Sequence, residues 1–200
     1  MKTRHMLALG NVVPVIFWGT ITVCGYVMGD YNHLTRLVSE LGAIGTRTQY
    51  IFTAGLLACA ILSVLFVVGL CQECKKREIS MIPALIILSF SLSIGGAAIF
   101  PLPLRMHLIM GMPSILLLLS PLAALVLWRR EKLPAGLRVW ATVSLTVMLL
   151  GFLAFMPDVL SSLLGLKQRF FHFGWSLWFI GLSRAFLRSL KEQGAKKSIV

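Results

Sequence analysis

The sequence predicts an all-α, polytopic membrane protein built as a bundle of six transmembrane helices, and three observations support this prediction. Hydrophobic residues make up 58% of the chain and charged residues 13%, whereas soluble domains carry about 25% charged residues. Six apolar segments recur along the chain, each about long enough to cross ~30 Å of hydrocarbon. Finally, the lysines and arginines gather on one side of the resulting topology.

Short polar intervals divide the chain into these segments, all within a single membrane domain, 1–200. We expect helices at residues 7–29, 50–71, 80–100, 108–128, 137–156 and 170–187. The first segment is longer than the ~7–15 apolar residues of a signal peptide, and no A-x-A site follows it, so it is predicted to be retained. Pro14 within it is tolerated because neighbouring helices can satisfy the freed backbone groups.

The later segments differ in character. Residues 80–100 contain Ser91 and Gly95, whose spacing of four favours close packing between helices. Residues 170–187 form the least apolar segment and contain Arg184, which can snorkel to the membrane boundary. Five aromatic residues suggest an interfacial belt at the entry side of this segment, namely Phe170, Phe171, Phe173, Trp175 and Trp178.

Charge sets the predicted orientation, with both termini cytoplasmic and residues 188–200 forming a basic cytoplasmic tail. The inner segments then hold 14 lysines and arginines and the outer segments hold 5, as the positive-inside rule expects. If residues 170–187 did not cross, the count would become 9 against 10. The prediction is therefore a multi-pass protein of the plasma membrane.

The net charge of +12 is spread in short clusters between apolar runs. This pattern predicts membrane lipids as partners and no nucleic acid. Cys71 and Cys74 form a CxxC without a second pair, so no metal site is predicted. His107 and His172 both lie at helix ends, which disfavours haem, so no cofactor is expected.

The interval at residues 30–49 is predicted to be an outer loop that contains a short amphipathic helix. At 100° per residue, His33, Arg36 and Glu40 fall on one arc of that helix. Two interpretations remain open: the helix lies at the lipid–water boundary with its charges in water, or His33 and Glu40 turn inward over a cavity.

Polar residues from three separate helix ends meet on the outer side of this topology. Gln168 and His172 stand four residues apart, so they share a helix face. The candidate binding residues are His33, Ser39, Glu40, His107, Gln168, Arg169 and His172. The sequence leaves the identity of any catalytic residue open.

Three features of the chain form a recognisable set: Ser39-Glu40-Leu41-Gly42-Ala43, His107, and the run Gly165-Leu-Lys-Gln168-Arg169. With them the chain resembles the domain-of-unknown-function 998 family of bacteria and archaea. It spans roughly residues 10–188 and implies a six-helix integral membrane protein without an established activity. The connector FPLPLRMH departs from the family pattern because it lacks an aspartate.

Three hypotheses for the polar residues follow. In the first, a polar pocket at the outer helix ends binds or senses a lipid headgroup or small amphiphile, with Arg169 holding an anion. In the second, an intramembrane enzyme acts on a lipid-like substrate, with His107 or His33 as acid or base. In the third, Glu40 pairs with Arg169 or Arg105 and the ion pair is purely structural. A transporter is disfavoured because no charge lies near the midplane of the first five segments.

Overall fold

The computed structural model describes residues 2–128, 133–134 and 136–197, with side chains as far as residue 192. Among these residues there are helices and connecting loops and no strand. Residues 129–132, which close the fourth predicted segment, and residues 198–200 of the predicted tail lie outside the described residues.

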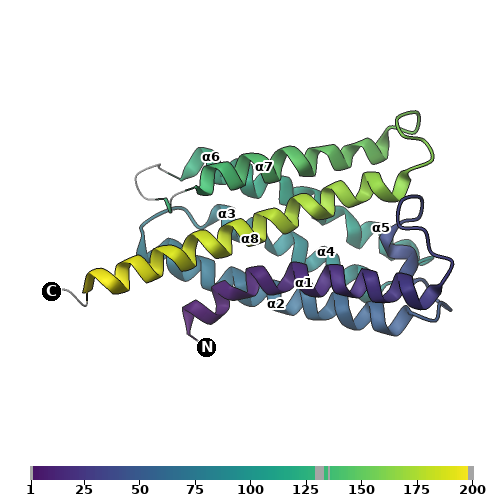
Figure 1. The fold of residues 1–200 in the computed structure, drawn as a ribbon, viewed down its shortest axis with the longest axis horizontal. Helices are drawn as coiled ribbons and strands as arrows, with labels where there is room; N and C mark the ends of the chain where they lie inside the picture. Colours follow the sequence, from purple (N-terminus) through teal and green to yellow (C-terminus); the bar gives the residue numbers. More distant parts are fainter. Residues whose placement is uncertain (1, 129–132, 135, 198–200) are drawn as a thin grey trace.

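The helices run alongside one another as an elongated bundle (Figure 1). The elements are α1 (Thr3–Met28), η1 (Val38–Gly42), α2 (Gln49–Lys76), α3 (Ile82–Ile86), α4 (Leu88–Ile99), α5 (Arg105–Gly111), η2 (Met112–Leu118), α6 (Leu119–Leu127), α7 (Leu137–Leu150), η4 (Gly151–Phe155) and α8 (Leu164–Lys197). The start of α1 and the end of α8 lie at the same end, here called the termini end. The opposite end, here called the loop end, carries the loops at 29–48, 100–104 and 156–163.

Five helical stretches of the described chain are long and apolar enough to cross a membrane, which makes this a multi-pass membrane protein. They are Thr3–Met28, Gln49–Lys76, Ile82–Ile99, Arg105–Leu127 and Leu137–Phe155. The fourth stretch is divided into α5, η2 and α6, and Pro113 lies at the start of η2. Proline lacks the N–H that an α-helical turn requires, which explains the change of helix type there. The last helix, α8, is not among the five.

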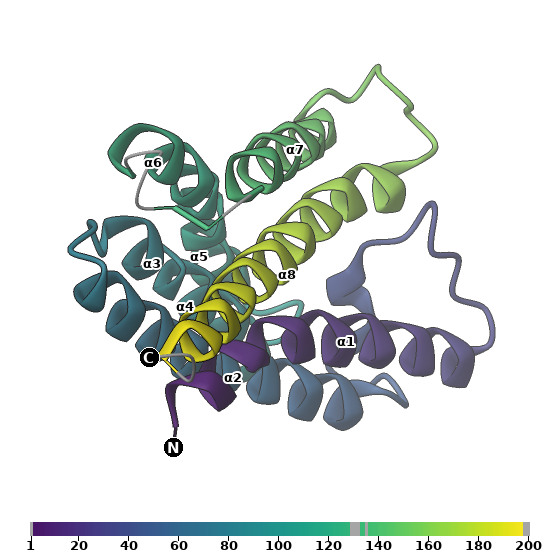
Figure 2. The same ribbon diagram turned by 60° about the vertical axis from the view of Figure 1, so that its left-hand side comes forward.

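Although α8 is the least apolar of the predicted segments, it lies in the core of the bundle. Figure 2 shows it crossing between α1 on one side and α7 on the other. Trp175, Trp178, Phe179, Leu182 and Phe186 along it are all 0% exposed. The prediction of an interfacial belt is therefore wrong for Trp175 and Trp178, because both rings are covered by neighbouring helices, whereas Phe173 is 53% exposed.

Polar and small residues fix α8 against its neighbours. Asn11 of α1 donates to the Ser183 hydroxyl at 2.6 Å, and Trp178 donates to Ser120 at 2.8 Å. A Cβ atom at Gly174 would lie 2.5 Å from Met148 of α7, so α7 and α8 approach too closely for a larger residue. In α4, Ser91 pairs with Ser63 at 2.6 Å, in line with the predicted close packing.

Candidate functional site

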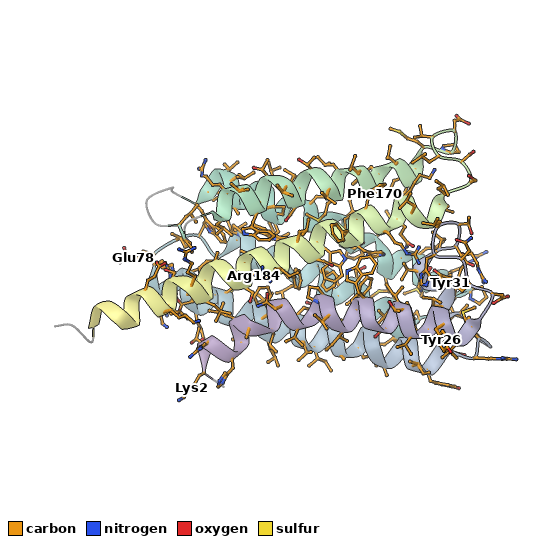
Figure 3. All side chains as sticks on the ribbon, in the orientation of Figure 1. Lys2, Tyr26, Tyr31, Glu78, Phe170 and Arg184 are labelled. Atoms are coloured by element: carbon orange, nitrogen blue, oxygen red, sulfur yellow. The ribbon has the colours of Figure 1, made fainter. Side chains whose placement is uncertain are left out.

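The loop at residues 29–48 contains a short helix, but this helix does not include His33 and Arg36 of the predicted polar arc. Only Val38–Gly42 is helical, as a short 3-10 segment. The Asn32 side chain accepts the Leu34 N–H at 2.9 Å, and such an Asx turn competes with helix formation. The loop folds back over the bundle, and Figure 3 places Tyr31 at the loop end, opposite Lys2 and Glu78.

Arg169 fastens this loop to the beginning of α8. Its guanidinium donates to the carbonyl oxygens of Arg36 at 3.1 Å and Gly165 at 2.9 Å, and to the Tyr31 hydroxyl at 3.0 Å. A further contact of 3.1 Å joins it to Nδ1 of His33, which must be the acceptor because arginine only donates. Arg169 is 9% exposed, so a charged group is buried here among dipoles.

Burial and the neighbouring Arg169 charge lower the pKa of His33, with burial the larger cause. Both causes disfavour the imidazolium. Burial likewise raises the pKa of Tyr31, while the bond from Arg169 opposes that rise. His33 is therefore held neutral, as its role of acceptor requires.

Glu40 pairs with Arg36, which the sequence analysis did not propose as its partner. Its carboxylate accepts from Arg36 Nε at 2.7 Å and from the Leu37 N–H at 2.8 Å. Asp30 approaches the same guanidinium at 4.0 Å. The predicted partners of Glu40, Arg169 and Arg105, are wrong. The loop places Arg36 against the carboxylate, while Arg169 contacts carbonyl oxygens, the Tyr31 hydroxyl and His33.

Lys167 fastens the loop at 156–163 to the beginning of α8, just as Arg169 fastens the loop at 29–48. Its ammonium donates to the carbonyl oxygens of Met156 at 2.9 Å and Val159 at 2.8 Å. The side chain is 1% exposed. Sequence reasoning missed this residue because a lysine at a helix start is usually solvated, and no pattern in the sequence distinguishes a buried one.

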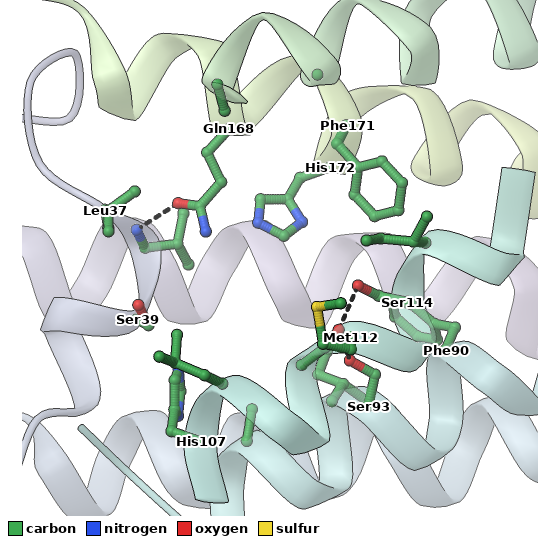
Figure 4. Close-up of a pocket in the computed structure, with 18 of the residues that line it drawn as sticks. Leu37, Ser39, Phe90, Ser93, His107, Met112, Ser114, Gln168, Phe171 and His172 are labelled. Carbon is green, nitrogen blue, oxygen red and sulfur yellow. Dashed lines mark hydrogen bonds between the residues drawn. The ribbon is translucent and has the colours of Figure 1, made fainter. Parts of the chain in front are cut away.

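A cavity of about 470 Å³ lies beneath the loops at this end, and its walls are largely apolar. Residues from α1, η1, α2, α4, α5, η2, η4 and α8 contribute to the lining. Four predicted residues line it, namely Ser39, His107, Gln168 and His172 (Figure 4). The other three, His33, Glu40 and Arg169, are not part of the lining and belong to the loop contacts above. The predicted polar pocket is thus an apolar cavity with a few polar groups.

The polar side chains in the lining present unused hydrogen-bonding groups. Gln168 accepts the Val38 N–H at 2.8 Å, which leaves its amide nitrogen free to donate, and Figure 4 shows that nitrogen turned toward the cavity. Nδ1 of His107 lies 2.8 Å from the Phe100 carbonyl. Because a carbonyl only accepts, Nδ1 carries the proton and Nε2 is an acceptor.

His172 has the opposite arrangement. Its Nδ1 accepts from the Trp175 indole at 3.1 Å, so Nε2 carries the proton. Within the described part of the chain, this buried Nε2 has no hydrogen-bond partner. An unpaired buried donor costs about 1–3 kcal/mol. A ligand in the cavity that accepts a hydrogen bond from this N–H would remove that cost.

These features define a class: a helical, multi-pass membrane protein with a largely apolar cavity under the loops at one end. The family model described as "Protein of unknown function (DUF998)" matches residues 12–185, and the chain belongs to this family. Comparison with curated proteins and with solved structures gave no match.

Proposed function

We propose that this protein crosses the plasma membrane six times and holds a single-chain amphiphile in the cavity at its loop end, which faces out of the cell. The cavity carries the proposal, because its size lies in the ~300–1,000 Å³ range of small-molecule sites and its walls are mostly apolar. One hydrocarbon chain suits such a volume better than a two-chain phospholipid does.

Six crossings require α8 to be a span, and its position supports this. It runs the length of the bundle beside α1 and α7, and at 34 residues it is longer than a bilayer requires. Its low hydrophobicity fits a helix whose neighbours are other helices rather than lipid. The excess of basic residues in the segments at the termini end then supports cytoplasmic termini.

The most exposed lining residues support entry of the ligand from the bilayer. Leu108 is 70% exposed, Met112 63% and Phe155 71%, although all three line the cavity. Their exposed side chains give the cavity wall an apolar outer surface on α5, η2 and η4. On the loop side, the Ile44 N–H donates to the Leu102 carbonyl at 2.8 Å, which ties two loops together above the cavity.

Native mass spectrometry of the detergent-purified protein with added hexadecyl phosphate or 1-O-hexadecylglycerol tests this proposal. Ala97→Phe fills part of the cavity and should abolish the ligand-bound peak. Ala54→Phe is the matched control, because Ala54 lies on the exposed face of α2 outside the lining. Equal binding by wild type and both variants would show that the ligand sits elsewhere.

An intramembrane enzyme is the second candidate, favoured by one observation. The Phe100 carbonyl fixes the His107 tautomer, so that a neutral imidazole nitrogen able to take up a proton belongs to a residue of the cavity wall. After incubation of the purified protein with a lipid extract, an enzyme yields a product of new mass that His107→Ala abolishes. A binding protein yields no product, and His107→Ala only weakens its affinity.

A further inference from the structure

The beginning of α8 contains two buried cations that form no ion pair with an acid in the described part of the chain. Lys167 is 1% exposed and Arg169 is 9% exposed, and both donate to backbone carbonyl oxygens of the loops. None of the ion pairs between described residues includes either of them. Carbonyl dipoles stabilise the two charges without cancelling them.

The acidic residues at the loop end do not neutralise the charges of Lys167 and Arg169. Glu40 and Asp30 both face Arg36, and Asp158 is exposed to solvent. The cavity lining contains no carboxylate. A positive potential therefore extends over the cavity, where a low dielectric weakens the field less than water does.

The hydrogen-bonding groups in the lining also favour a negatively charged ligand. Gln168 stands between the two cations in the sequence, and its amide nitrogen is turned toward the cavity. One turn further along α8, the buried Nε2–H of His172 lacks a partner within the described chain. Both groups donate, so together they favour a ligand rich in acceptor oxygens.

We infer that the polar group of the bound amphiphile is an anion, a phosphate monoester or a carboxylate, held near Gln168 at the start of α8. This inference rests on the proposed function, because it specifies the head group of the ligand whose chain occupies the cavity. The buried charges of Lys167 and Arg169 attract the anion from behind, and the Gln168 amide donates to it.

Competition between four probes in the native mass spectrometry assay tests the inference on the full-length protein. Hexadecyl phosphate should bind at least about tenfold more tightly than neutral 1-O-hexadecylglycerol, and hexadecyltrimethylammonium should bind least. Inorganic phosphate alone should not bind, because the apolar chain supplies most of the contact. If inorganic phosphate binds as tightly as hexadecyl phosphate, the site takes a free anion and the inference is wrong.

The outcomes separate the two proposals. Equal affinity for hexadecyl phosphate and the neutral glycerol ether overturns the anionic head group and leaves the amphiphile site standing. Failure of every amphiphile to bind overturns the proposed function itself.

Substitutions near the head group provide an independent check. Gln168→Glu keeps an acceptor for the Val38 N–H, removes the amide donor and adds a negative charge, so it should weaken hexadecyl phosphate at least about tenfold. The glycerol ether, which loses one hydrogen bond but is not repelled, should be weakened much less. Lys167→Gln keeps a donor for the two carbonyls and removes a positive charge, so it should act in the same direction. Arg47→Gln removes a charge from the exposed part of the first loop and should leave both ligands unchanged. If Gln168→Glu weakens both ligands equally, the effect is not electrostatic and the inference fails.

Discussion

The two ends of the bundle bury charge in opposite ways. At the termini end, Glu73 is 1% exposed and pairs with Lys76 at 2.8 Å and with Arg77 at 3.6 Å. Arg77 in turn donates to Ser189 of α8 at 2.9 Å and lies over the Phe186 ring. At the loop end, Lys167 and Arg169 are also buried, but their side chains contact carbonyl groups instead of carboxylates.

This difference shows that a buried charge can be stabilised either by an opposite charge or by backbone dipoles alone. The termini end contains an acid together with its bases, so that opposite charges are paired within the protein and hold α2 against α8, although Glu73 Oε2 and Arg77 Nε have no hydrogen-bond partner among the described residues. The loop end leaves positive charge uncompensated beside a cavity, which is an arrangement suited to an anionic ligand. Three substitutions and one change of pH test the contrast, in order from the largest expected effect to the smallest.

Glu73→Gln should be the most damaging change. It leaves Arg77 buried without a carboxylate, and breaking a buried pair in this way costs about 3 kcal/mol. Thermal unfolding in detergent should therefore show a marked fall in Tm. The matched control is Glu192→Gln, which removes an exposed pair with Arg188 and should cost at most about 0.5 kcal/mol. Similar Tm values for the two variants would mean that the termini end is not held by its buried pair.

Arg169→Lys should come second, with a loss of about 2 kcal/mol. Lysine keeps the charge but lacks the planar fork that reaches two carbonyls, a hydroxyl and His33 together. Hydrogen exchange should become faster in the loop at 29–48 and stay unchanged at the termini end. Uniform acceleration throughout the bundle would contradict a local role for this residue.

Glu40→Gln should have a small effect. The pair with Arg36 is partly exposed, with side-chain exposures of 34% and 31%, so its loss should cost about 0.5 kcal/mol. Ligand binding should not change, because Glu40 does not line the cavity. A large drop in affinity with a normal Tm would instead assign Glu40 to the site.

Lowering the pH should produce the smallest effect, through His33. The folded protein holds the pKa of His33 below its ordinary value of 6.5, so below about pH 6.5 the unfolded chain binds this proton more readily. Stability should accordingly be constant above pH 6.5 and fall as the pH drops from there toward the lowered pKa. The loss should be smaller in His33→Gln, which keeps an acceptor for Arg169. An identical pH profile for wild type and variant would rule out His33 as the responsible group.

The sequence predicted which residues of the site lie on the same helix face or at the same end of the bundle. Gln168 and His172 were placed on one helix face, and the lining of the cavity contains both. His33 and Arg169 were assigned to one end of the bundle, and the structure brings them within 3.1 Å. Their roles were not predictable, because a loop that is not helical brings Arg36 to Glu40 and leaves Arg169 to the carbonyl groups.

The sequence by itself determined that this chain forms apolar helices able to cross a membrane and that its polar residues collect in the connections between them. Both follow from properties of about twenty consecutive residues, which need no knowledge of the neighbours. Only the tertiary structure decided that α8 lies in the core, that Lys167 is buried and that the cavity is apolar. These features depend on which side of each helix faces another helix. The rotation of each helix about its own axis is set by packing between segments far apart in the sequence.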